Sequence, residues 1–107
     1  MKKFEAMTAR EEAIAKLEEA IRAVQEQIKS NQEDWKGNVP PDLPITCLQE
    51  LEKLCALTKN KQAVKELAED SEVMFLLTDL PFTDKSPTFQ KVMKAIRACR
   101  WVKSDAE

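Results

Sequence analysis

The chain of 107 residues has no histidine, no tyrosine and only one glycine, Gly37. Histidine is the side chain whose unperturbed pKa lies closest to neutrality, and glycine-rich loops let a backbone wrap around a phosphate group. Most common enzyme designs need one or the other, and no carboxylates or cysteines are spaced to replace them. We therefore expect a binding protein that is not an enzyme and that holds no cofactor.

The chain contains few cysteines, and their spacing is not that of a known type of metal site. Cys47, Cys55 and Cys99 are odd in number, far apart and embedded in apolar helical patterns. Zinc sites usually contain ligands in C-x-x-C spacing or added histidines, and neither is present. We expect reduced, buried thiols, which are typical of a nuclear or cytoplasmic protein.

Long apolar runs are absent as well. The longest uncharged apolar stretch, residues 73–77, is far too short to span a bilayer. The residues that follow Met1, Lys2, Lys3 and Phe4 include charged side chains, whereas a signal peptide would continue with an apolar run. We expect a soluble protein with no membrane partner.

The residues that are present have the composition of one small helical domain. The chain is 43% apolar and 34% charged, and it is rich in Ala, Leu, Glu and Lys, which favours an all-α domain over residues 1–107 with a single core. The net charge of −2 conceals an asymmetry: acids predominate in residues 61–84, whereas residues 85–103 contain six lysines or arginines and no acid. Such a division is a candidate footprint for a partner.

A long first helix is predicted after Thr8, because Thr8 and Glu11 have the spacing of a capping box. Apolar residues then recur every seven positions, with a column of small residues beside them. The stripe consists of Met7, Ile14, Ile21 and Ile28 with Leu17 and Val24, and the small column of Ala6, Ala13 and Ala20. This pattern fits either a core-facing helix or a coiled coil between two copies, so a homodimer through the first helix remains an alternative.

Prolines define the long loop of the sequence, residues 36–46, because three prolines there are incompatible with a helix interior. A second capping box from Thr46 to Gln49 predicts the start of the next helix. A short helix is expected over residues 62–68, and Ser71 is expected to cap another over residues 72–80. We expect the apolar residues of that helix to form the centre of the core: Val73, Met74, Phe75, Leu76, Leu77 and Leu80.

The last helix is predicted to start at Ser86 and Pro87, a cap followed by proline at the first helical position. Its apolar face consists of Phe89, Val92, Met93, Ile96 and Cys99, and its cations are Lys91, Lys94, Arg97, Arg100 and Lys103. Cations spaced by three wind around a helix instead of lining one face. We therefore expect no direct nucleic-acid binding, and we interpret Trp101 as an aromatic residue at the edge of the core.

Several segments resemble one known family. Residues 28–30, Ile-Lys-Ser, then a loop, then residues 47–58, CLQELEKLCALT, are similar to the opening of the integrase-binding domain of lens epithelium-derived growth factor and its hepatoma-derived growth factor relatives. Residues 73–77, VMFLL, followed by Leu80, Pro81 and Phe82, are similar to the fourth helix and the loop after it in that family. Residues 92–94 are similar to its final helix.

The resemblance implies a compact right-handed bundle of four to five helices, of the type found in the N-terminal domain of the elongation factor TFIIS. It also implies a nuclear adaptor for chromatin and transcription proteins, in which two adjacent interhelical loops bind short disordered protein segments. Carried over residue by residue, the first loop offers Val39, Asp42 and Leu43, and the second offers Phe82.

A different function stays open on the residues alone. The chain could serve as a structural assembly unit, through self-association of the first helix or as an armadillo-like helical cap. In neither interpretation do we expect a small-molecule substrate.

Overall fold

The computed structural model describes residues 8–30, 42–80 and 85–102, and these ranges contain five α-helices and no strand. The helices are α1 (Ala9–Ser30), α2 (Leu43–Lys59), α3 (Lys65–Glu69), α4 (Glu72–Asp79) and α5 (Pro87–Cys99). The predicted all-α bundle with a long first helix is confirmed.

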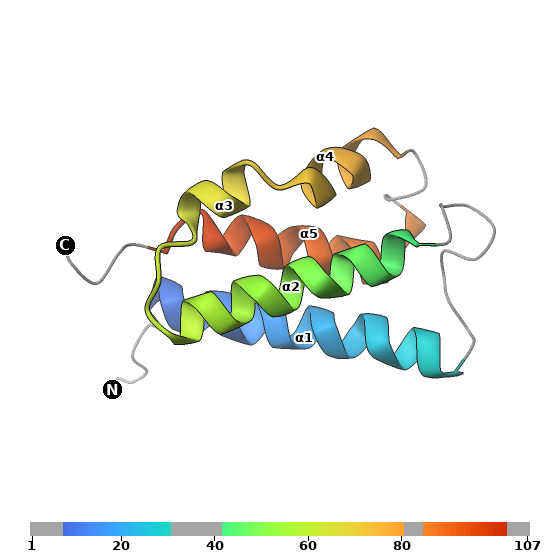
Figure 1. Cartoon of the computed structure of the whole chain (residues 1–107). Coiled ribbons are helices and arrows are strands. Elements are labelled where there is room, and N and C mark those ends of the chain that lie inside the picture. Colours follow the sequence, from blue (N-terminus) through green and yellow to red (C-terminus); the bar gives the residue numbers. More distant parts are fainter. Residues whose placement is uncertain (1–7, 31–41, 81–84, 103–107) are drawn as a thin grey trace, which may run out of the picture.

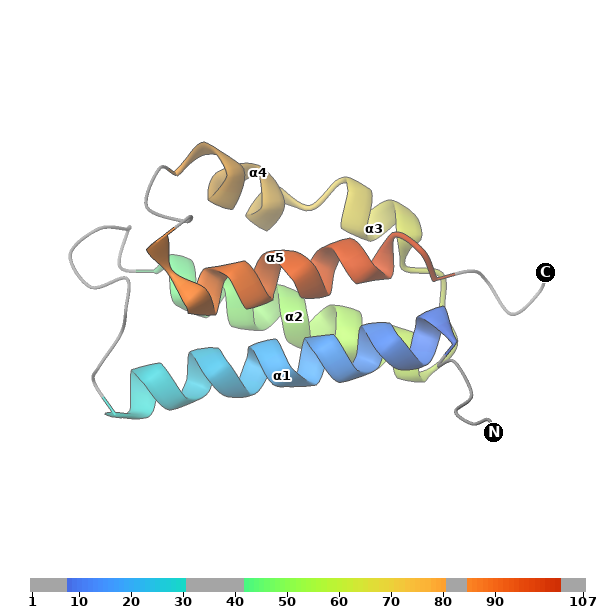
Figure 2. The ribbon, with the colours of Figure 1, turned by 180° about the vertical axis from the view of Figure 1, so that it is seen from behind.

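Three long helices form the body of the molecule. α1 runs antiparallel to both α2 and α5, which run in the same direction as each other (Figures 1 and 2). The short helices α3 and α4 pack against α5, and α4 also contacts α2. Helix α5 therefore lies between α1 and the pair formed by α3 and α4 (Figure 1).

Four helix ends meet at one end of this bundle. Helices α1 and α4 end there, and α2 and α5 begin there (Figures 1 and 2). We call it the connector end, because residues 31–41 and 81–84 join these helix ends along the chain. The opposite end is where α1 begins and where α2 and α5 finish.

Three of the predicted helix starts are confirmed by hydrogen bonds. The Glu11 backbone N–H donates to Thr8 Oγ1 at 3.1 Å, and the Thr8 N–H donates to Glu11 Oε1 at 3.0 Å, which completes the capping box of α1. The hydroxyl oxygens of Ser71 and Ser86 each accept from the backbone N–H three residues later, at 3.2 and 3.1 Å. These caps satisfy donors that the first turn of a helix leaves unpaired.

The predicted start of α2 is wrong. The helix begins at Leu43, so Thr46 lies in its first turn, where its hydroxyl donates to the Asp42 carbonyl oxygen at 3.1 Å instead of capping. Pro44 does not prevent this earlier start, because the first turn of a helix needs no backbone donor at that position. The predicted loop over residues 36–46 therefore includes the first residues of a helix.

Helix α2 ends in a motif that usually contains glycine. The Gln62 N–H donates to the Leu57 carbonyl oxygen at 2.8 Å and the Lys61 N–H to that of Thr58 at 3.1 Å, which is the Schellman pattern. Lys61 occupies the left-handed position with a φ of 62°. This turn extends through Gln62, so α3 starts at Lys65, later than the predicted residue 62.

The core lies where α1 faces α2 and α5 together. Its fully buried members on α1 are Ala13, Leu17, Ala20 and Val24. Ile21 and Ile28 belong to the predicted apolar stripe and pack against this core, but they are only partly buried, so they lie at its edge. A helix that packs on two neighbours is closest to both along its smallest residues, because alanine lets the backbones approach.

The prediction for α4 is correct for one face only. Val73, Met74 and Leu77 are buried, but Phe75 is 65% exposed and Leu76 is 49% exposed. A helix of two turns that lies on the outside of the bundle can bury one side, and no described element covers its other side. In α5, by contrast, the whole predicted apolar face is buried: Phe89, Val92, Met93, Ile96 and Cys99.

Enlarging the small column should separate α1 from its neighbours. We expect Ala20→Leu to lower the free energy of unfolding by about 1–3 kcal/mol, because the three added carbon atoms have no space at a fully buried site. The control Ala15→Leu, on the exposed side of the same helix, should change it by less than about 0.5 kcal/mol. Urea denaturation of both variants tests this, and equal losses would contradict the packing described.

The left-handed backbone conformation of Lys61 provides a second test of the structure. Replacing Lys61 by glycine should raise the free energy of unfolding by up to about 1 kcal/mol, because glycine adopts positive φ without steric cost. The same replacement at Lys53, an exposed position inside α2, should lower it by about 1 kcal/mol. The two variants are compared by chemical denaturation, and a less stable Lys61→Gly protein would show that the turn has another geometry.

Candidate functional site

The residues predicted to contact a partner fall into two groups. Val39 and Phe82 lie outside the described residues. Asp42 and Leu43 are described and lie at the N-terminal end of α2, which belongs to the connector end (Figure 1). Of these two, Asp42 is exposed and Leu43 is only 4% exposed.

Asp42 occupies the cap position of α2 without using its carboxylate as a cap. Its backbone has φ −91° and ψ −5°, which is helical instead of the extended geometry that folds a side chain over the first turn. The backbone carbonyl oxygen accepts from the Thr46 N–H at 3.0 Å, whereas the side chain makes no capping hydrogen bond. The carboxylate is thus exposed and makes no capping hydrogen bond to α2.

Leu43 belongs to the core, together with Pro44 and Cys47 on the same side of α2. Its side chain fixes the start of the helix instead of pointing to solvent. The exposed apolar side chain in this first turn is Ile45, at 48%. The sequence analysis missed Ile45 because it treated this segment as loop, and a helix starting at Leu43 would have placed Ile45 away from the buried side.

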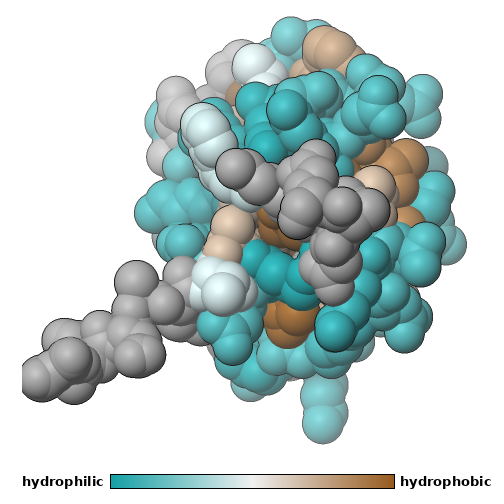
Figure 3. Space-filling view, turned by 90° about the vertical axis from the view of Figure 1, so that its left-hand side faces the viewer, coloured by the Kyte–Doolittle hydropathy of each residue, from teal (hydrophilic) through white to brown (hydrophobic). Residues whose placement is uncertain are grey.

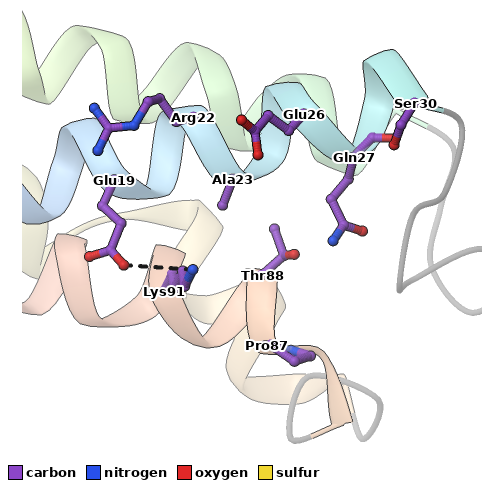
Figure 4. A pocket seen from close by; sticks show the side chains of 9 residues that line it. All are labelled: Glu19, Arg22, Ala23, Glu26, Gln27, Ser30, Pro87, Thr88 and Lys91. Carbon is purple, nitrogen blue, oxygen red and sulfur yellow. Dashed lines mark hydrogen bonds and ion pairs between the residues drawn. The ribbon is translucent and has the colours of Figure 1, made fainter.

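A polar groove runs between the second half of α1 and the start of α5, and Figure 4 shows the side chains along it. Its volume is about 420 Å³. Lys91 Nζ lies 3.6 Å from Glu19 Oε2 across it, so this ion pair links the two helices. Because α1 ends and α5 begins at the connector end, the groove leads towards it. Its lining consists of Glu19, Arg22, Ala23, Glu26, Gln27, Ser30, Pro87, Thr88 and Lys91.

A second ion pair links α1 to α2. Lys59 Nζ lies 2.7 Å from Glu18 Oε2. The hydrogen bond to Lys59 lowers the pKa of the Glu18 carboxyl, and the same bond raises the pKa of Lys59. Both side chains are substantially exposed, so the pair sets the alignment of the helices more than it stabilises them.

The cysteines are buried and free, as the sequence predicted. Burial raises the pKa of the Cys47 thiol to about 12 and that of Cys99 to about 11. Burial also raises the pKa of Cys55, which borders a groove between α1 and α2. Thiolate is the reactive form, so all three thiols are poor nucleophiles in the folded protein.

Figure 3 shows the surface of the opposite end of the bundle. Hydrophilic residues cover much of it, and hydrophobic residues appear there only in separate patches (Figure 3).

Over the described residues, no group of three or more His, Cys, Asp or Glu side chains is arranged to hold a metal ion. None of the described helices has the length and hydropathy needed to cross a membrane.

Comparison with known proteins identifies no relative. No protein-family model, curated protein or solved structure gives a significant match to this chain.

The raised thiol pKa values predict slow modification. With a maleimide near neutral pH we expect Cys47 and Cys99 to react far more slowly than a free thiol, with Cys55 the first to be modified because it lies at a groove. Rates should rise with pH, because the thiolate fraction increases towards each pKa. In denaturant all three should react at ordinary rates. Mass spectrometry of timed samples gives the order, and rapid native labelling of Cys47 would contradict the burial described.

Proposed function

We propose that this chain is a protein-interaction module that binds short disordered segments at its connector end, within a nuclear adaptor for chromatin and transcription proteins. The observation that carries the proposal is the meeting of four helix ends at that end, which brings the starts and finishes of both connectors together (Figures 1 and 2). The resemblance to integrase-binding domains requires two neighbouring connectors in these positions of the chain.

A receptor for disordered segments works best when it is rigid. The ligand loses conformational entropy when it binds, and a receptor that also had to become ordered would lose affinity further. The helices that frame the connector end are held by a common core, and α5 is capped there by Ser86. The ligand therefore meets a preformed frame.

Polar and apolar groups suited to a peptide lie at this end. The Asp42 carboxylate is exposed and makes no capping hydrogen bond, so it can accept from backbone N–H groups of a ligand and set its register. Ile45 offers an exposed apolar side chain one turn away. Val39 and Phe82 are the further contacts that we propose from the resemblance, with Phe82 as the apolar anchor.

The groove of Figure 4 gives the ligand a continuation between α1 and α5. Its charged side chains of both signs suit a polar segment that extends beyond the anchor. Self-association through α1 has less support, because Ile21 and Ile28 pack against the core of their own chain.

The anchor is tested with an unbiased ligand. A displayed library of short segments from disordered regions of nuclear proteins is selected on the wild-type chain, and the enriched peptides are measured by titration. We expect micromolar dissociation constants, as for other small, partly polar interfaces. Phe82→Ala should weaken binding by about 1–3 kcal/mol, and Asp42→Asn by a similar amount if it accepts ligand N–H groups.

The matched control is Trp101→Ala, which removes an exposed aromatic side chain at the opposite end. It should leave unchanged the affinity of those peptides that Phe82→Ala weakens, and circular dichroism should show the same helix content in all variants. Ligand-induced amide shifts should concentrate at the start of α2 and the start of α5. If no enriched peptide binds the Phe82 variant more weakly than the wild type, or if the shifts are confined to α3, the connector end is not the binding site.

A further inference from the structure

A second groove lies at the opposite end, between the start of α1 and the last turns of α5. Its volume is about 270 Å³. Glu12 and Lys16 line it from α1, Lys94 and Arg97 from α5, and Trp101 from the turn after α5. Figure 2 shows these two helix segments side by side.

Trp101 is exposed although its backbone is fixed. The side chain is 75% exposed, but the Trp101 N–H donates to the Ala98 carbonyl oxygen at 3.2 Å. The neighbouring Val102 is 2% exposed, and its N–H donates to the Cys99 carbonyl oxygen at 3.2 Å. The indole ring is thus presented from an anchored turn. An indole ring that is exposed to solvent on a fixed backbone can bury a large apolar area against a partner.

Two cations of the groove have no ionic partner among the described residues. Lys94 and Arg97 are exposed, and neither side chain forms an ion pair or hydrogen bond with any described residue. Lys16 is partly neutralised by Glu12, whose Oε2 lies 3.7 Å from its Nζ. The groove therefore carries three cations against one carboxylate, next to the indole ring.

The tertiary structure creates this charge cluster. Along α5 alone the cations wind around the helix, and Lys91 is used in the ion pair with Glu19. Lys94 and Arg97 lie one turn apart on α5, Trp101 follows in the turn after the helix, and all three line the same groove. Lys16 joins them from α1 across the groove.

We propose that this groove binds an acidic linear segment of another protein, with an aliphatic or aromatic side chain packed on Trp101 and carboxylates paired with Lys94 and Arg97. Charge complementarity selects the acidic segment, and the exposed indole selects an apolar residue within it. A segment carrying both features complements Trp101, Lys94 and Arg97.

A nucleic acid fits the groove less well. A phosphate backbone binds through many cations, whereas this groove offers three and includes the Glu12 carboxylate, which repels phosphate. In a peptide ligand, the same carboxylate accepts from backbone N–H groups. The site is independent of the proposed function, because it lies at the other end of the bundle from Asp42 and Ile45.

The test uses a displayed library of short segments whose positions vary among Asp, Glu, Leu, Phe and Ser. Enriched peptides are titrated against a Trp35→Phe protein, in which Trp101 is the remaining tryptophan, so its fluorescence reports directly on the groove. We expect saturable binding that shifts this fluorescence and weakens as salt is added. The same peptides with Gln and Asn in place of their acids should bind at least about tenfold more weakly.

Two groove variants and one matched control locate the site. Trp101→Ala, and the double change Lys94→Glu with Arg97→Glu, should each weaken binding by about tenfold or more. Lys53→Glu with Lys65→Glu makes the same change in net charge at exposed positions outside the groove and should alter affinity by less than about twofold. Polarisation of a labelled peptide gives these affinities, and circular dichroism checks that each variant is folded.

Three results would overturn the proposal. The first is a selection that enriches no acidic segment. The second is an enriched peptide whose affinity is the same for wild type and both groove variants. The third is a single-stranded oligonucleotide that binds more tightly than the peptides and displaces them, which would assign the groove to nucleic acid. Peptides that bind here should be unaffected by Phe82→Ala, so the outcome does not depend on the connector end.

Discussion

The structure depends on the close packing of α1 against two helices at once. Ala13 and Ala20 are fully buried and alternate along α1 with the larger Leu17 and Val24, so α2 and α5 can both approach the same stripe of α1. Ion pairs on either side of the stripe, Glu18 with Lys59 and Glu19 with Lys91, align the three helices. Because α1 is antiparallel to both partners, this packing also brings the starts of α2 and α5 to the end where α1 finishes (Figure 1).

That arrangement divides the molecule into two chemically different ends. The connector end combines an acid that is not used as a cap, an exposed isoleucine and a mixed-charge groove. The opposite end combines an anchored indole ring with cations from two helices. A small helical bundle can carry two recognition surfaces, because each needs only exposed side chains on a rigid frame.

The sequence predicted correctly those features that depend on residues within a single helical turn. The capping box of Thr8 and Glu11 and the serine caps of α4 and α5 depend on atoms within one turn, and all three were predicted correctly. The start of α2 was predicted wrongly because Thr46 also has the residue type of a cap, yet burial of Leu43 extends the helix past it. Of the predicted contact residues, Asp42 is exposed and Leu43 is buried, a difference that depends on which side of α2 meets the core. Ile45 was missed for the same reason.

The sequence by itself determined the all-α class, the long first helix, the buried reduced thiols and the apolar face of α5, because helix propensity, caps and 3.6-residue periodicity are properties of neighbouring residues. Only the tertiary structure decided that alanines form the innermost stripe of α1, that Phe75 and Leu76 stay exposed, and that Lys16 joins Lys94 and Arg97 beside Trp101. These features depend on which helices become neighbours. That choice is made by the fit of whole helix faces in three dimensions, and the pattern along a single helix does not contain it.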